Sequence, residues 1–159
     1  MNDLPQLLAI QQIGRTHRVF LQAFEATIGH SMPRWRIFLR LSQAGRLSQK
    51  QLARDLGLDP ASLTRQIKAM EQQGWVRRAN DAADNRLTNV ELTEAGWAVF
   101  REAFPRRSAF IENAFGDLSA DEVASLVSLL QKLENHLLSD LALAQSKKNP
   151  ADGPGGSMQ

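Results

Sequence analysis

The chain has 159 residues, of which 43% are apolar, 6% aromatic and 23% charged, which is typical of one globular domain with an accessory arm. It contains no cysteine, and this excludes disulfides, thiolate nucleophiles, Cys-ligated zinc and thiol redox switches. Its formal net charge is only +2, so the distribution of charge along the chain is more informative than its sum.

The basic excess lies in residues 1–92, whereas residues 93–159 hold six basic against nine acidic residues. This distribution indicates an anionic partner for the first part and a self-associating or merely solvated second part. Random scatter explains the same counts, so charge alone does not decide between the two interpretations.

The chain has neither a membrane span nor a secretory signal in its sequence pattern. Its longest apolar runs, such as Leu7–Ile10, are far shorter than the roughly 20 residues that cross a bilayer. The first residues include Asp3 and Pro5 and show no basic start followed by an apolar run. We expect a cytoplasmic protein.

Two amphipathic helices are predicted first. In residues 4–28 apolar side chains recur at steps of three and four, which is the period of a helix with one buried face. Gly29 ends this helix, and Pro33 begins a shorter one that ends near Gly45.

Two capped helices follow. Ser48, the start of a capping box, opens a short helix that ends at Gly57. Asp59 caps a second one that ends at Gly74. The apolar residues of this second helix share one face and are expected to point inward: Leu63, Ile67 and Met70.

After Gly74 the pattern changes to that of a small hairpin, with strands at 75–78 and 87–92 around a polar loop at 79–86. Thr93 then caps a helix in which Pro105 marks a bend or a break.

The last helix is opened by the capping box of Ser119 and Glu122, and its apolar residues from Val123 to Leu141 form a seam like that of a coiled coil. Residues 145–159 are polar and rich in glycine and proline, so we expect a disordered tail.

This order of elements is that of a winged helix-turn-helix, a DNA-binding scaffold. We therefore predict a mostly α fold with a small β wing: a winged domain at 34–96 and a helical dimerisation region at 4–30 and 97–144. The apolar stripes of the first and last helices are too extensive for the winged unit to cover. They are expected to cover each other in a homodimer.

Five segments match a known family in order and spacing. They are Leu47–Ala53 (LSQKQLA), Asp59–Arg65 (DPASLTR), Glu71–Arg78 (EQQGWVRR), Asp84–Arg86 (DNR) and Leu92–Gly96 (LTEAG). With these motifs the chain resembles the MarR family of bacterial transcription regulators, including its SlyA branch, over about residues 4 to 144.

The resemblance implies a triangular homodimer whose terminal helices form the dimer domain and whose two winged units grip a palindromic operator. One departure is Asn85, which stands where a second arginine often precedes the wing arginine. Each wing therefore carries one charge less than in some relatives, and the salt dependence of binding is expected to be milder.

The second capped helix carries the candidate DNA contacts. Arg65 can bind a guanine edge with two hydrogen bonds, and Lys68 suits a phosphate. Ser62, Thr64 and Gln66 can reach bases or phosphates. The alternative for all five is an ordinary solvated helix face.

The hairpin adds further candidates. Arg86, with Asn85 beside it, lies near the tip, where an arginine suits a narrow minor groove. Asp84 is expected to orient Arg86 or to tie the wing to its base. Arg77 and Arg78 point to opposite faces of a strand, so at most one of them contacts a phosphate, and Arg77 is our candidate. The alternative for the tip arginine is a weak surface ion pair.

A ligand site is predicted at Arg15, Arg18 and Trp35, since an arginine pair beside an indole suits a small aromatic carboxylate or phenolate. The resemblance implies a site of this kind in the crevice between dimer domain and winged unit. Alternatively, Trp35 belongs to the core, and the two arginines are surface or dimer contacts.

The sequence predicts neither an enzyme nor a metal or other cofactor. Its three histidines are scattered, and it has no glycine-rich phosphate loop or nucleophile elbow. Together with these absences, the resemblance implies a bacterial, ligand-responsive regulator of transcription, a repressor in preference to an activator, which joins the nucleoid when bound to DNA.

The alternative function is a dimeric helical adaptor whose winged unit grips a partner protein. Such an adaptor has no need of Arg65, Lys68 and Arg86 together on one side, so alanine at all three would leave its binding intact.

Overall fold

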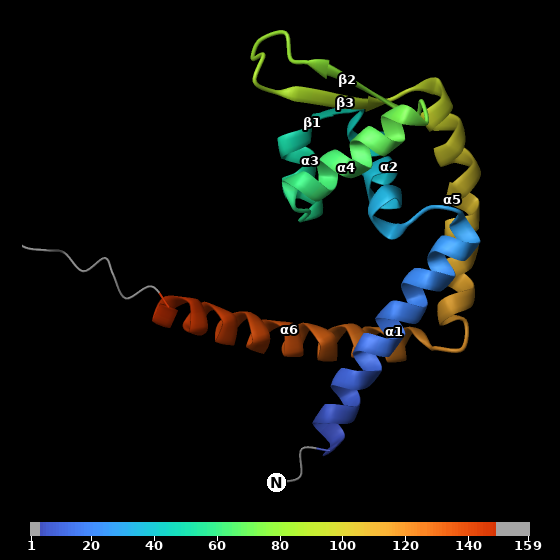
Figure 1. Cartoon of the computed structure of the whole chain (residues 1–159). Helices are drawn as coiled ribbons and strands as arrows, with labels where there is room; N and C mark the ends of the chain where they lie inside the picture. Colours follow the sequence, from blue (N-terminus) through green and yellow to red (C-terminus); the bar gives the residue numbers. More distant parts are fainter. Residues whose placement is uncertain (1–3, 149–159) are drawn as a thin grey trace, which may run out of the picture. The chain divides into compact units, whose positions relative to one another are not determined.

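Residues 4–148 are described by a computed structural model (Figure 1). The chain divides into two compact units, residues 1–113 and 114–159. The helices and strands, in chain order, are α1 (Leu4–Ile28), α2 (Met32–Ala44), β1 (Arg46–Ser48), α3 (Gln49–Leu56), α4 (Pro60–Gln72), β2 (Val76–Asn80), β3 (Thr88–Leu92), α5 (Glu94–Phe115) and α6 (Ala120–Lys148). This order confirms the predicted fold class.

The helix-turn-helix begins and ends where local chemistry predicts. Ser48 Oγ accepts a hydrogen bond from the Gln51 amide at 3.1 Å and so caps α3. Gly57 then ends α3 in the left-handed region, at φ 60°. The carboxylate of Asp59 accepts from the Ser62 amide at 2.9 Å, which caps α4 and lowers the pKa of Asp59.

The sheet has three antiparallel strands in the order β1-β3-β2. The hairpin of β2 and β3 was predicted, with strand ends within about two residues of those observed. The third strand, β1, was not predicted. It pairs Arg46 with Glu91 and Leu47 with Val90, which places the start of the helix-turn-helix against the base of the wing.

The core of the winged unit lies between the inner face of the sheet and helices α2, α3 and α4. Its buried residues include those predicted for α4: Leu63, Ile67 and Met70. A second buried cluster joins α1, α2 and α5 through Phe24, Ile28, Trp35 and Ala103. These two clusters fix α4 and the wing on one scaffold.

Helix α5 continues through Pro105, so of the two predicted alternatives, a bend or a break, the break is excluded, although a proline removes one hydrogen bond from the helix ladder. One boundary differs from the prediction. Helix α6 ends at Lys148, so residues 145–148 of the predicted tail are helical. Its polar end continues a helix that is already established by the capping box of Ser119 and Glu122. The rest of the predicted tail lies outside the described residues.

Helices α1 and α6 expose much apolar surface within this chain. None of the described side chains of α6 is buried, and Leu130 and Leu137 are 40% and 60% exposed. On α1, Leu4, Leu7 and Leu8 are exposed as well. Across residues 4–148, no helix combines the length and the hydropathy that crossing a bilayer requires.

Candidate nucleic-acid interface

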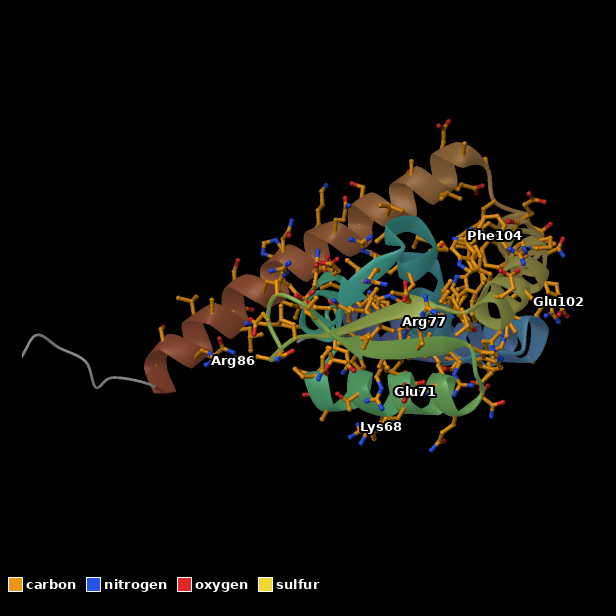
Figure 2. The ribbon with its side chains drawn as sticks, turned by 90° about the horizontal axis from the view of Figure 1, so that it is seen from above. Lys68, Glu71, Arg77, Arg86, Glu102 and Phe104 are labelled. Carbon is orange, nitrogen blue, oxygen red and sulfur yellow. The ribbon has the colours of Figure 1, made fainter. Side chains whose placement is uncertain are left out.

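Helix α4 turns a polar face outward. Arg65 and Lys68 are exposed on it, and Arg65 Nη2 donates a hydrogen bond to Ser62 Oγ at 2.9 Å. Lys68 stands on the same helix in Figure 2. The face that carries these residues lies opposite the buried Leu63 and Ile67, as the helical period predicts.

Two further candidates on α4 are less accessible than predicted. Thr64 Oγ1 donates to the Pro60 carbonyl at 2.9 Å and accepts from Gln49 Nε2 at 3.3 Å, so its hydroxyl already serves the contact between α3 and α4. Gln66 is half-buried, and its Oε1 is buried without a partner among the described residues. Their contacts with DNA stay a prediction.

The exposed cations of this unit fall into paired and unpaired groups. Arg77 pairs with Glu91 and Arg78 with Glu71, each at 2.6 Å. Arg65, Lys68 and Arg86, in contrast, make no ion pair with any residue between 4 and 148. Figure 2 shows Arg86 at the tip end of the hairpin. Unpaired cations therefore lie on α4 and on the wing tip, and exposed cations without an ion pair also occur at Lys50 of α3 and at Arg15 and Arg18 of α1.

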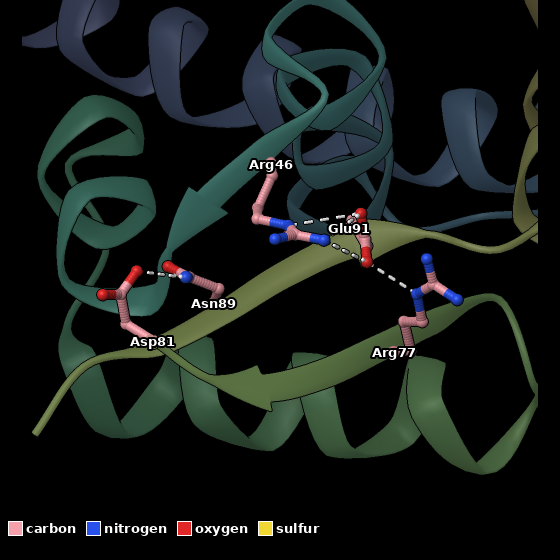
Figure 3. A network of polar contacts seen from close by, with 5 residues as sticks. All are labelled: Arg46, Arg77, Asp81, Asn89 and Glu91. Carbon is pink, nitrogen blue, oxygen red and sulfur yellow. Dashed lines mark hydrogen bonds and ion pairs between the residues drawn. The ribbon is translucent and has the colours of Figure 1, made fainter. Parts of the chain in front are cut away.

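Glu91 lies between two arginines on the outer face of the sheet (Figure 3). It accepts from Arg77 Nε at 2.6 Å and from Arg46 Nη2 at 3.0 Å. These hydrogen bonds, first that of Arg46 and then that of Arg77, lower the pKa of the Glu91 carboxyl. Arg77 thus reaches a phosphate only in competition with Glu91, which the sequence reasoning did not foresee.

Arg77 and Arg78 do lie on opposite faces of β2, as the strand period predicts. Arg78 bonds to Glu71 of α4 on the inner side, and this hydrogen bond lowers the pKa of Glu71. The Arg78 side chain is 30% exposed, against 69% for Arg77. Arg78 therefore joins the wing to α4.

The wing loop is organised by Asp81, which the sequence analysis did not single out. Its Oδ1 accepts from the amides of Ala83 and Asp84 at 2.9 and 3.1 Å, and its Oδ2 accepts from Asn89 Nδ2 at 2.7 Å. Figure 3 shows the bond to Asn89. The hydrogen bond from Asn89, followed by those from the two amides, lowers the pKa of Asp81. An Asp followed by two small residues and another Asp was the available signal, since Asp favours such turns.

Asp84 supports the wing through the backbone of Arg86. Its Oδ1 accepts from the backbone amide of Arg86 at 3.0 Å, and its carboxylate makes no ion pair with the Arg86 guanidinium in the structure. Asp84 therefore fixes the backbone from which Arg86 extends and leaves the cation free.

Replacing Asp81 by alanine is expected to loosen the wing loop, because three hydrogen bonds lose their acceptor. The Ala83 and Asp84 amides should exchange their hydrogens about tenfold faster, as measured by NMR. In the wild type the same bonds should hold at neutral pH and fail as the pH falls below 3.8, the ordinary pKa of Asp, through the lowered pKa of Asp81.

Asp84→Ala is the matched control for this change. It removes only the acceptor of the Arg86 amide, so it should accelerate exchange at Arg86 and not at Ala83. Equal protection of Ala83 in the wild type and in Asp81→Ala would show that Asp81 does not organise the loop.

The predicted ligand residues are not brought together at one exposed place. Trp35 is only 3% exposed and stacks on Phe100 at a centroid distance of 5.4 Å, which makes it a core residue. Arg15 and Arg18 are exposed on α1. A ligand site that combines these three residues stays a prediction.

A winged helix-turn-helix with unpaired cations on its second helix and on its wing tip belongs to the DNA-binding class of this fold. Residues 30–88 match the sequence model of the MarR family. The chain is 29% identical to YdgJ, an uncharacterised HTH-type transcriptional regulator of Bacillus subtilis, over 128 residues that make up 80% of this chain and 78% of YdgJ. The chain is thus similar, over residues 30–88, to the MarR family of transcriptional regulators.

Solved structures support the fold. A mutant MarR from E. coli, complexed with operator DNA, has a TM-score of 0.74 and 21% identity over 84% of this chain and 98% of that chain. BpsR of Bordetella bronchiseptica, whose DNA binding is regulated by 6-hydroxynicotinic acid, has a TM-score of 0.69 and 22% identity over 80% and 98% of the two chains.

Proposed function

We propose that this regulator is a homodimeric repressor that binds a palindromic operator and is released by a small aromatic acid. The observation that carries the proposal is the set of three cations without ion-pair partners on α4 and the wing tip: Arg65, Lys68 and Arg86. Because such a cation is exposed and has no carboxylate partner, it can bind phosphates and base edges without first breaking an ion pair.

Each cation has its own place on DNA. Helix α4 fits a major groove, where Arg65 hydrogen-bonds a guanine edge and Lys68 contacts a phosphate. Arg86 enters the adjacent minor groove from the wing tip. Asn85 and Ser62 contact the backbone beside them, and Arg77 contributes a phosphate contact when it leaves Glu91.

The exposed apolar surface of α1 and α6 supports the dimer. Apolar side chains of this number are rarely left in water, and a second copy of the same helices is the partner that requires no other protein. The two winged units of such a dimer are related by a two-fold axis, so the operator is an inverted repeat. A dimer seated on an operator within a promoter excludes polymerase, which makes the regulator a repressor.

The effector is a small aromatic acid, as 6-hydroxynicotinic acid is for BpsR. A ligand that changes the spacing of the two α4 helices breaks their match to the DNA repeat, and contacts in one half-site are lost. Linkage requires that operator DNA lower the affinity for the ligand by the same factor by which the ligand lowers the affinity for DNA. A coupling free energy of about 1–3 kcal/mol is typical.

The test of the function is selection of bound sequences from a randomised pool of duplex DNA. The wild type should select an inverted repeat whose half-site centres lie about 10 base pairs apart, the spacing at which two recognition helices meet the same side of DNA. A pool that shows no enrichment after repeated rounds would contradict DNA binding and favour an adaptor.

The dimer is tested in the same selection with Leu130→Glu/Leu137→Glu. Burying an unpaired carboxylate is costly, so this variant should not form the dimer, as measured by light scattering, and should select no inverted repeat. Ser128→Glu/Asn135→Glu has the same seven-residue spacing on α6 but replaces polar side chains, and it should stay dimeric. A soluble dimer of the leucine variant would show that α6 is not the interface.

A further inference from the structure

The guanidinium of Arg65 is held by a neighbour on its own helix, unlike the cations of Lys68 and Arg86. Its Nη2 donates a hydrogen bond to Ser62 Oγ at 2.9 Å. Residues three apart are neighbours on a helix face, so this bond runs along the exposed side of α4. Within residues 4–148, the side chains of Lys68 and Arg86 donate no hydrogen bond to the chain. Of these three cations, Arg65 is thus the one with a preferred direction.

Ser62 is itself fixed by the cap of α4. The Asp59 carboxylate accepts from the Ser62 amide at 2.9 Å. Hydrogen bonds from Ser62, first that of its amide, and then the charge of Arg65 lower the pKa of the Asp59 carboxyl. Because the Ser62 oxygen accepts from Arg65, its O–H hydrogen is left for Asp59 or, on DNA, for a phosphate. The three residues form one chain of contacts, from the N-cap of α4 to the guanidinium of Arg65.

The other polar side chains in this part of α4 have less freedom to contact bases. The Thr64 hydroxyl is already used within the chain, and Gln66 is half-buried. Base recognition by this helix therefore depends mainly on the direction in which Arg65 points. A guanidinium has five N–H donors, of which one goes to Ser62, so a pair remains for a guanine edge.

We propose that Ser62 is a positioning residue that sets the base specificity of α4 by holding the Arg65 guanidinium toward the base edges, a role that rests on the proposed DNA-binding function. An arginine side chain that is already held loses less rotamer freedom when it binds. A fixed planar fork also matches the two acceptors of guanine better than it matches the edges of other bases. This role is separate from any contact that Ser62 itself makes with a phosphate.

The test compares guanine with 7-deazaguanine in the selected operator. The analogue lacks the N7 acceptor but keeps its Watson–Crick pairing, so substituting each guanine in turn identifies the one that Arg65 recognises. In the wild type this substitution should weaken binding about tenfold, as measured by fluorescence anisotropy. In Arg65→Ala it should have no effect at that guanine.

Ser62→Ala should reduce the tenfold discrimination to about threefold or less, because Arg65 is still present but no longer held. The variant keeps the helix cap, since Asp59 accepts from a backbone amide that alanine also has. Ser62→Thr keeps the hydroxyl and should restore most of the discrimination. In an Arg65→Ala background, Ser62→Ala should leave the discrimination unchanged.

Ser128→Ala is the control for these variants. It also removes an exposed hydroxyl from a helix, but on α6 and not on α4. Both the affinity and the discrimination should stay at the wild-type level. Thermal melting of each variant checks that it is folded.

Four outcomes would overturn the role of Ser62. Full discrimination in Ser62→Ala would show that Arg65 is positioned without Ser62. An equal loss of affinity for both operators would make Ser62 a phosphate contact only. A further loss of discrimination by Ser62→Ala in the Arg65→Ala background would mean that Ser62 contacts the base itself. No effect of any 7-deazaguanine on the wild type would mean that Arg65 recognises no guanine.

The failure of the DNA-binding function has a different signature. If the wild type enriches no duplex DNA, that function is refuted, and the role of Ser62 is refuted with it. An operator that binds the wild type and Ser62→Ala with the same discrimination refutes the role of Ser62 alone.

Discussion

Replacing Arg65 by alanine is expected to weaken operator binding by about 1–3 kcal/mol per half-site and to relax specificity at one base pair. Arg65 is exposed on α4, has no carboxylate partner in the described chain, and is steadied by Ser62 Oγ. Its guanidinium is thus positioned to bind a guanine edge, and alanine leaves that edge without its donors. Fluorescence anisotropy with operators substituted at each position measures both effects.

Arg86→Ala should act differently on the same operators. A minor-groove cation contributes mostly through phosphates and groove potential, so affinity should fall evenly across sequences and the salt slope should decrease by about one counterion. Arg101→Ala is the control, since that arginine is exposed on α5 and paired with Glu94. An Arg65→Ala/Arg86→Ala variant with wild-type affinity and salt slope would refute the assigned interface.

Replacing Gly96 by alanine is expected to destabilise the chain by about 3 kcal/mol or more, the upper end of the cost of overpacking. A Cβ at this position would lie 1.9 Å from the Trp75 carbonyl oxygen and 2.9 Å from its carbonyl carbon. Both atoms are backbone, and the oxygen already accepts from the Thr93 amide. Either α5 or the turn after α4 must move, and Tm should fall by roughly 10 °C.

Gly14→Ala is the matched control for Gly96→Ala. Gly14 also lies in a helix, but a Cβ there meets nothing within 4 Å in this chain. Alanine should therefore raise stability by about 0.5–1 kcal/mol through its lower backbone entropy. Calorimetric melting of both variants checks the pair. Equal Tm values would mean that the close approach of Gly96 to Trp75 relaxes without cost.

The elements predicted from the sequence are those set by local chemistry. Ser48 and Asp59 cap helices because their side chains reach an amide three residues on, and such a contact needs no knowledge of the fold. The buried face of α4 likewise follows from the helical period. This is why the helix-turn-helix, and with it the exposed positions of Arg65 and Lys68, could be predicted well.

What could not be predicted depends on register between strands far apart in the sequence. Strand β1 is three residues long and is defined by its pairing with β3. That pairing places Arg46 beside Glu91, while the register of β2 brings Arg77 to the same carboxylate. The role of Asp81 depends on Asn89 in the same way. None of these contacts leaves a periodic signal.

The ion pair between Arg78 and Glu71 has a mechanical consequence. It joins β2 to α4 on the inner side of the sheet, and the Trp75 amide ties the intervening turn to Met70. Helix α4 and the wing are thus connected at both ends of one short turn and move as one rigid body. In a dimer, the distance between the two such bodies can change while each body keeps its shape. Substitutions that alter the preferred operator spacing and substitutions that alter base preference can therefore occur in different parts of the chain.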